Sequence, residues 1–133
     1  MTNKSKKILS EISAGELLDK ISILDIKLNK IKEKDSLDYI KKEHQILTKE
    51  REKNIDPNID INPLYLKLKS INEKLWIIED EKRLCEKNSD FKEKFIKLSR
   101  DVHFLNDKRA QVKLEINKIL ESNIREIKEY TEY

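Results

Sequence analysis

The sequence predicts an all-α fold, in which antiparallel helical hairpins form a four-helix, coiled-coil-like bundle. Residues that break helices are rare, since the 133-residue chain contains one Gly and two Pro. Apolar residues recur at alternating steps of four and three along most of the chain, which is the spacing of one helix face. Charged residues make up 41% of the chain and fill the other faces. A chain this polar can also be disordered, but regular apolar spacing argues against disorder.

The first helix is predicted to run from about Ala14 to about Lys34. Ser13 and Glu16 have the spacing of a capping box, in which each side chain bonds the backbone N–H of the other residue. The apolar face of this helix consists of Leu17, Ile21, Leu24, Leu28 and Ile31. Residues 1–12 precede the capping box and are expected to form a flexible N-terminal segment.

The second helix is predicted to begin at Asp35 or Ser36, which are good N-cap residues, and to end near Asn54. Its apolar face consists of Leu37, Ile40, His44 and Leu47. Residues 55–62 contain Pro57 and several Asp and Asn residues, so they are expected to form the main loop of the domain.

Two longer helices follow this loop. Asn62 and Pro63 predict the start of the third helix, as its N-cap and first helical residue. The segment 88–90 separates it from the fourth helix, which is predicted to begin near Asp90 and run to about Leu120. The apolar seam of the third helix is Leu64, Leu68, Ile71, Leu75, Ile78, Lys82 and Cys85. The seam of the fourth is Phe91, Phe95, Leu98, Val102, Leu105, Val112, Ile116 and Ile119.

Short connections between the first and second helices, and between the third and fourth, predict antiparallel neighbours. A single bundle domain therefore covers residues 13–121, and residues 122–133 form a C-terminal tail that adds a turn or packs loosely. On the rear face of the third helix, Leu66, Ile77 and Leu84 form a second apolar stripe. A second apolar face on a helix needs a second surface to pack against, so we expect a homodimer or a partner helix at this stripe.

One charged residue interrupts the seam of the fourth helix. Arg109 stands where the spacing calls for an apolar residue between Leu105 and Val112. A guanidinium buried in a helix seam destabilises the fold unless it is paired with a carboxylate or binds a ligand. Asn106 and Lys113 project to the same side of this helix. Arg109 therefore marks either a lock that fixes helix pairing or a ligand site.

The sequence leaves both interpretations of Arg109 open. As a lock, Arg109 would form a bidentate ion pair with Asp25 or Asp19, and Arg109→Leu would hold or raise the melting temperature. As part of a cleft, Arg109 and Lys113 would bind a phosphate or carboxylate. Asn72 and Asn106 would then orient that ligand.

The third helix carries a second polar stripe beside its seam, made of Asn72, Trp76, Glu79 and Arg83 with Asp80 adjacent. Trp76 is expected to be a packing anchor. In an enzyme, the acid and base would have to come from Glu79, Asp80 or Glu16. Glu16 and Asp19 also have the spacing of a magnesium-dependent nucleotide pyrophosphatase, with Glu126 and Glu129 as the companion pair, but such spacings are common in Glu-rich chains.

Several function classes are not expected. The net charge is only +3 and the basic and acidic residues are interspersed, so nucleic-acid binding is not expected. The two His residues are isolated and Cys85 is the only cysteine, so no metal site or cofactor is expected. No apolar run has membrane-spanning length, and the N-terminus lacks the apolar segment of a secretory signal. The expected compartment is the cytoplasm.

Three segments resemble a family of short, all-helical bacterial and phage proteins that is classed only as a domain of unknown function. They are GELLDKISIL at 15–24, INEKLWIIED at 71–80 and NDKRA at 106–110. The resemblance implies a polar signature of candidate binding residues: Glu16, Asp19, Lys20, Asn72, Trp76, Glu79, Asp80, Arg83, Asn106, Asp107, Arg109 and Lys113. The chain departs from the family pattern at Glu121, where Gly is expected before Ser122.

The resemblance implies no activity. We therefore expect a helical interaction or accessory module without enzymatic function. The alternative is a protein that binds, or acts on, a small anionic ligand such as a nucleotide, sugar phosphate or carboxylate. In that alternative the ligand would be held by Arg109, Lys113 and Asn106.

Overall fold

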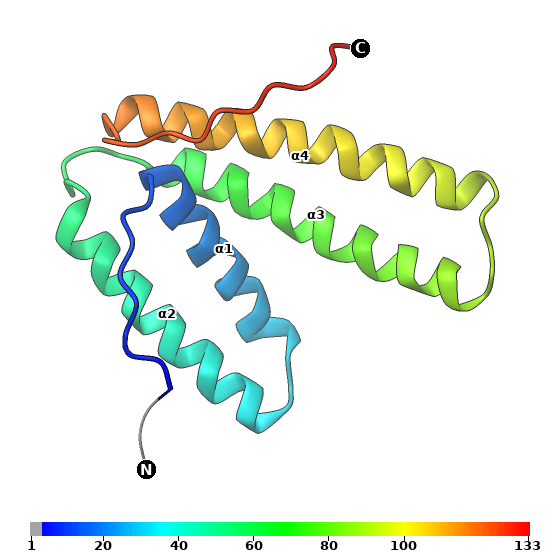
Figure 1. Ribbon diagram of the computed structural model, residues 1–133, viewed down its shortest axis with the longest axis horizontal. Helices are drawn as coiled ribbons and strands as arrows, with labels where there is room; N and C mark the ends of the chain where they lie inside the picture. The colour runs from blue at the N-terminus through cyan, green and yellow to red at the C-terminus, as the bar shows by residue number, and fades with distance from the viewer. Residues whose placement is uncertain (1–3) are drawn as a thin grey trace.

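The computed structural model describes residues 4–133, and within them the chain forms four α-helices and no strand. The helices are α1 (Ala14–Lys30), α2 (Lys34–Asn54), α3 (Asn62–Lys87) and α4 (Glu93–Ile119). Figure 1 shows two antiparallel hairpins, α1–α2 and α3–α4. The predicted all-α bundle of four helices is therefore confirmed. The first three residues of the predicted N-terminal segment lie outside the described range.

The central helix of the fold is α1. It packs against each of the other three helices, whereas the backbone of α2 packs closely only against α1 and reaches α3 through the Arg51 side chain, which lies over the Tyr65 ring. α1 crosses the base of the long α3–α4 hairpin obliquely, and the rest of that hairpin projects beyond α1 and α2 (Figure 1). We call the projecting part, residues 73–108, the arm. Across the described residues, no helix is long and apolar enough to cross a membrane.

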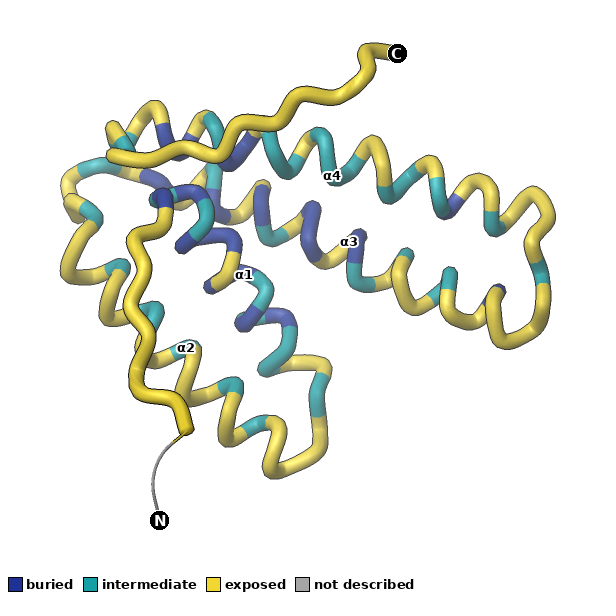
Figure 2. The backbone as a smooth tube through the Cα atoms, viewed as in Figure 1, coloured by how far each residue is buried: buried dark blue, intermediate teal, exposed yellow. Residues whose placement is uncertain are grey.

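The core lies where α1 crosses α3 and α4. Leu18, Leu68 and Ile116, one from each of these helices, are completely buried. α2 contributes no buried residue, and its predicted apolar face is only half-buried. Figure 2 shows the buried residues concentrated at this crossing, with few along the arm. The crossing is therefore the part of the fold that apolar burial stabilises most.

The predicted boundary between the first two helices was displaced by a few residues. α1 ends at Lys30 rather than near Lys34. The N-cap of α2 is Glu33, whose carboxylate accepts hydrogen bonds from the backbone N–H groups of Asp35 and Ser36, at 2.9 and 2.7 Å. The two carboxylate oxygens of Glu33 thus satisfy two free N–H groups, and the predicted caps lie inside the helix.

The starts of the two long helices also differ from the prediction. Ile61 is the N-cap of α3, and Asn62 is its first helical residue without a capping hydrogen bond. α4 begins at Glu93 rather than near Asp90, because the Asp90 carboxylate accepts from the Lys92 N–H at 3.2 Å and holds a turn there. Two predicted seam residues are half exposed: Phe91, which precedes α4, and Ile119, its last residue.

The end of α4 requires a left-handed residue. Its C-cap is Leu120, and the next residue, Glu121, has φ 50°. Gly was expected at this position, and Gly adopts positive φ at little cost. The chain therefore holds Glu in a conformation that costs an L-residue about 1–2 kcal/mol.

Glu121→Gly is expected to raise the free energy of unfolding by about 0.5–1 kcal/mol, because relief of this conformation outweighs the added freedom of Gly in the unfolded chain. Urea denaturation followed by circular dichroism measures the change. Glu115→Gly, at an exposed site inside α4, is the control and is expected to lower the free energy of unfolding by about 1 kcal/mol. Equal losses in both variants would contradict the prediction.

Candidate functional site

A buried carboxylate joins three helices at the crossing. Asp19 of α1 is 1% exposed. It accepts a hydrogen bond from Arg109 Nε of α4 at 2.9 Å and a second from the same guanidinium, and it accepts one from Asn72 Nδ2 of α3 at 2.9 Å. This is the bidentate geometry in which Arg binds a carboxylate most strongly. Hydrogen bonding to Asp19 also raises the pKa of Arg109 above its ordinary value, so the guanidinium stays charged.

The ammonium group of Lys113 lies among three carboxylates beside this pair. Its Nζ lies 2.6 Å from Glu16 Oε2, 3.1 Å from Glu126 Oε2 and 3.9 Å from Asp19 Oδ2. Burial alone would lower the pKa of Lys113, but the hydrogen bonds to Glu16 and Glu126 and the nearby negative charges outweigh it and raise the pKa. We call Glu16, Asp19, Asn72, Arg109 and Lys113 the polar layer.

The polar layer brings together carboxylates that the sequence offered as magnesium ligands. Glu16, Asp19 and Glu126 do converge, but the cation among them is the Lys113 ammonium. The described residues contain no group of three or more His, Cys, Asp or Glu side chains placed to hold a metal ion. The charge balance of the carboxylates is therefore supplied by the chain itself.

The first turn of α1 is capped from the far end of the chain. Asn117 Oδ1 accepts from the Gly15 N–H at 2.7 Å, and Ser122 Oγ accepts from the Ala14 N–H at 3.0 Å. Ser13 Oγ accepts from the Glu16 N–H at 3.1 Å, which is one half of the predicted capping box. The other half is absent among the described residues, because the Glu16 carboxylate pairs with Lys113 instead.

Gly15 permits a very close approach between α1 and α4. A Cβ atom added at this position would lie 2.6 Å from the Lys113 carbonyl oxygen and 2.9 Å from Asn117 Oδ1. Real Cβ atoms do not approach backbone that closely. The only glycine of the chain therefore stands where any side chain would push the two helices apart.

A second polar cluster joins α1 to α2 and α3. Asp25 lies 2.8 Å from His44 Nε2 and 3.9 Å from Lys69 Nζ, and it accepts a hydrogen bond from the Tyr65 hydroxyl. Burial and this hydrogen bond raise the pKa of Tyr65 well above its usual range. Arg109 was predicted to pair with Asp25 or Asp19. Its partner is Asp19, and Asp25 belongs to this second cluster instead.

The remaining candidate residues lie at the edge of the polar layer or beyond it. Lys20 is exposed at its edge, 3.7 Å from Glu16. Asn106, one turn before Arg109 in α4, is half-buried, and its side chain forms no hydrogen bond to another described residue. The candidates on the outer half of α3 lie on the arm, where Trp76 is half-buried and Glu79, Asp80 and Arg83 are exposed.

Sequence reasoning missed three polar residues that complete this region. Ser22 Oγ accepts from Asn72 Nδ2 at 2.8 Å and donates to the Asp19 carbonyl at 2.8 Å. Asn117 and Ser122 cap α1, as described above. Ser22 lies one turn after Asp19 on the same face of α1, and Asn117 lies one turn after Lys113 on the same face of α4. This spacing is the feature of the sequence that could have identified them. Their partners lie on other elements, so spacing alone does not reveal them.

The C-terminal tail runs back along α4 without forming a helix (Figure 1). Glu126 attaches it to Lys113 at 3.1 Å. At its end, the Tyr133 hydroxyl donates a hydrogen bond to Asp107, and its ring stacks on His103 with 5.3 Å between centroids. Of the two alternatives predicted for the tail, an added helical turn or loose packing, the helical turn is not formed.

Acid is expected to detach the tail from α4. The hydrogen bond from Lys113, with the charges of Lys113 and Lys128, lowers the pKa of Glu126 below its ordinary value of 4.5. A carboxylate whose pKa is lowered by docking stabilises the docked tail fully at pH values above the pKa it has in the detached tail. This stabilisation is lost as the pH falls through the lower pKa that it has in the docked tail. Methyl NMR of Ile124 and Ile127 from pH 6 to pH 3, roughly the range that brackets a carboxyl titration, measures the release.

Glu126→Gln is the control for this titration, because it removes the charge without changing the shape of the side chain. Its tail methyl groups are expected to show the detached shifts already at neutral pH. A titration step of unchanged size in Glu126→Gln would contradict the role assigned to Glu126.

The chain belongs to a family of unknown function, DUF6165, whose family model matches residues 8–132. No curated protein and no solved structure shows significant similarity to it. Family membership assigns no activity.

Proposed function

We propose that this DUF6165 protein is a non-enzymatic helical interaction module. In this proposal the polar layer locks α1 onto the α3–α4 hairpin, and the arm is the surface that binds a partner. The observation that supports the lock most directly is the pairing of Asp19, a buried carboxylate held by Arg109 of α4 and Asn72 of α3. A buried, bidentate pair between helices specifies their register.

The charges in the polar layer argue against the anionic-ligand alternative. Arg109 and Lys113 already face three carboxylates, those of Glu16, Asp19 and Glu126. Lys20 and Lys128 also pair with Glu16 and Glu126, so every cation here already has a carboxylate partner. A phosphate or carboxylate bound there would have to compete with these carboxylates for the same cations. The space beside Lys113 beneath the tail measures about 190 Å³, which is below the roughly 300–1,000 Å³ of typical ligand sites.

A thermal-shift screen of phosphorylated metabolites and sugar nucleotides tests this choice. None is expected to raise the melting temperature of the wild type, because the cations are already paired. The comparison variant is Asp19→Asn/Arg109→Leu, which removes both charges of the central pair. A compound that stabilises the wild type but not this variant would support the ligand alternative and overturn the lock.

The pairing of Arg109 with Asp19 reverses the expectation from sequence that Arg109→Leu holds or raises the melting temperature. It would leave the Asp19 carboxylate buried without its bidentate partner, and an unpaired buried charge is strongly destabilising. Arg109→Leu is therefore expected to lower the melting temperature, and adding Asp19→Asn is expected to recover part of the loss.

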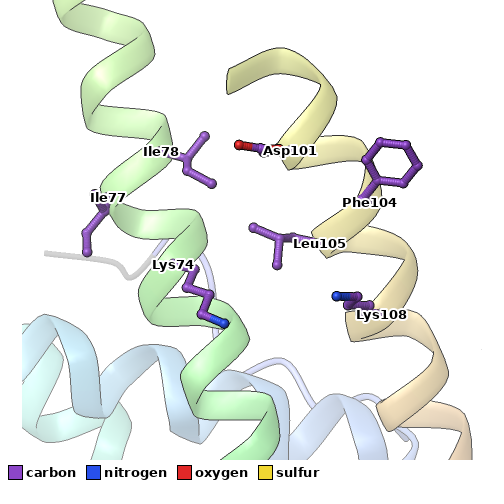
Figure 3. A pocket seen from close by; sticks show the side chains of 7 residues that line it. All are labelled: Lys74, Ile77, Ile78, Asp101, Phe104, Leu105 and Lys108. Carbon is purple, nitrogen blue, oxygen red and sulfur yellow. The ribbon is translucent and has the colours of Figure 1, made fainter. Parts of the chain in front are cut away.

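The partner proposed for the arm is a second copy of this chain. Ile77 and Leu84 are about half exposed on α3, and Ile77 lines a groove of about 340 Å³ between α3 and α4. Figure 3 shows Ile78 and Leu105 facing each other across this groove, with Lys74 and Lys108 toward one end. Leu66 continues the exposed apolar stripe of α3 toward the base of the hairpin. An apolar stripe on a projecting hairpin suits burial against another helix.

Charge complementarity favours a second copy. In an antiparallel pair of α3 helices centred on Ile77, Lys74 lies three residues before the centre and Asp80 three residues after it. Lys74 of one copy then lies level with Asp80 of the other, and the two-fold symmetry of the dimer forms this pair twice. Neither residue forms an ion pair with any described residue of its own chain, so both remain available.

Sedimentation equilibrium tests the dimer. The wild type is expected to dimerise at concentrations of roughly tens of micromolar, a typical range for a modest interface. Ile77→Lys is expected to be monomeric, whereas Ile46→Lys, at an equally exposed site on α2, is expected to dimerise normally. Lys74→Glu is expected to weaken the dimer and Lys74→Glu/Asp80→Lys to restore it. A monomeric wild type would refute this partner while leaving the lock untouched.

The proposal also includes a cytoplasmic location, coiled-coil-like packing of the arms, and the bacterial or phage origin that the resemblance implies.

A further inference from the structure

A cavity of about 900 Å³ lies between the N-terminal segment, the end of α2 and the end of α4. Its walls come from residues 8–14, from the C-terminal half of α2 with the loop that follows it, and from residues 120–123. Figure 1 shows the N-terminal segment crossing α2 on its way to the start of α1. No residue of the polar layer or the arm lines this cavity, so it is independent of the function proposed above.

The walls of the cavity are aliphatic. Leu17 is buried, and Leu47, Ile55, Ile59 and Leu120 are half-buried. None of the chain's aromatic side chains is among the lining residues, so the cavity offers no surface on which a planar base or ring would stack. A volume within the usual range of ligand sites, with aliphatic walls, suits a flexible hydrocarbon chain.

The charged residues around the cavity are all acidic. None of the 29 Lys and Arg residues of the chain lines it, whereas four carboxylates do. These are Glu11, Glu50, Asp56 and Glu121. None of them forms an ion pair with another described residue. A concave surface with one sign of charge attracts ligands of the opposite sign, so the cavity favours cations and disfavours phosphates and carboxylates.

The N-terminal segment closes one end of the cavity. Ser13 is buried as the N-cap of α1, and Glu11 Oε2 accepts a hydrogen bond from Asn123 Nδ2 at 2.7 Å. Further out, Ile8 and Leu9 are almost fully exposed. A helix with its side chains is about 10–12 Å wide and would have to displace this segment. A single hydrocarbon chain is much thinner, so it is the occupant that the closed end favours.

We propose that this cavity binds an amphiphile with one aliphatic chain and a cationic head group. The chain packs on Leu47, Ile55 and Ile59, and the head group lies beside the carboxylates of Glu50 and Asp56.

Methyl NMR with dodecylammonium and dodecanoate tests the proposal, with both probes below their critical micelle concentrations. Five isoleucines line the cavity and report on it directly: Ile8, Ile12, Ile46, Ile55 and Ile59. Dodecylammonium is expected to cause saturable shifts in these methyl groups and not in Ile96 on the arm. Dodecanoate, with the same chain and the opposite charge, is expected to bind at least about tenfold more weakly.

Two variants of equal exposure separate the cavity from the rest of the surface. Ile46→Lys places a cation at the cavity and is expected to weaken dodecylammonium binding about tenfold. Ile77→Lys, on the arm, is expected to leave binding unchanged. Equal binding of the two probes, shifts of equal size at Ile96, or no effect of Ile46→Lys would each overturn the proposal. Displacement of the N-terminal segment by an apolar helical peptide at the same site would also overturn it.

Discussion

Replacing Asp19 with alanine is expected to lower the free energy of unfolding by about 3–5 kcal/mol, as breaking a buried ion pair does. The carboxylate is 1% exposed and is the shared acceptor for Arg109 and Asn72. Without it, the guanidinium loses its bidentate partner at the helix crossing and Asn72 loses one of its acceptors. Domains are stable by only about 5–15 kcal/mol in total, so this variant is expected to be marginal. Urea denaturation followed by circular dichroism measures the loss.

The matched control is Asp101→Ala on the surface of the arm. Asp101 accepts from Lys97 one turn away, at 2.6 Å, and the Lys97 side chain is largely exposed. A pair of this kind contributes about 0.3–0.5 kcal/mol. The comparison holds the type of interaction constant and changes its burial. If both variants lost the same stability, Asp19 would not be the centre of the fold.

Replacing Gly15 with alanine is expected to lower the free energy of unfolding by about 1–3 kcal/mol, the usual cost of overpacking. Helix propensity alone predicts the opposite sign, since alanine is favoured over glycine inside a helix by about 0.5–1 kcal/mol. The new Cβ would lie 2.6 Å from the Lys113 carbonyl oxygen. α1 would have to move away from α4, which weakens the hydrogen bond from the Gly15 N–H to Asn117.

A second substitution shows whether backbone or side chain causes this loss. Gly15→Ala/Asn117→Ala removes the side-chain oxygen that lies 2.9 Å from the new Cβ, but the Lys113 carbonyl oxygen remains. The stability lost on Gly15→Ala is therefore expected not to return. Full recovery in the double variant, or a more stable Gly15→Ala protein, would contradict a backbone contact between the two helices.

The fold was predictable because its main signal is local. The four-and-three spacing of Leu17, Ile21 and Leu24 depends only on the helix itself, and all three are buried. Arg109 was found for the same reason, as a break in a regular seam. Its partner required more than periodicity, because Asp19 and Asp25 lie on neighbouring turns of one helix. Which of them faces α4 depends on the angle at which α1 crosses the hairpin.

The rest of the site was less predictable because its contacts are not local. Asn72 and Asn106 were equivalent in the sequence, yet only Asn72 faces α1 and bonds Asp19. The N-cap of α2 was missed because Glu is a less usual cap than the neighbouring Asp35 and Ser36. The tail carries no periodic pattern, so its course along α4 depends on individual contacts such as Glu126 with Lys113.

The capping of α1 by Asn117 and Ser122 has a consequence for the order of folding. These hydrogen bonds join groups 102 and 108 residues apart in the chain. α1 is made early during synthesis, but two N–H groups of its first turn obtain their partners only after residue 122 has been made. Contacts of such long range slow folding, because the loop they close is ordered before they form. The helix at the centre of the bundle is therefore expected to be one of the last elements to become fully native.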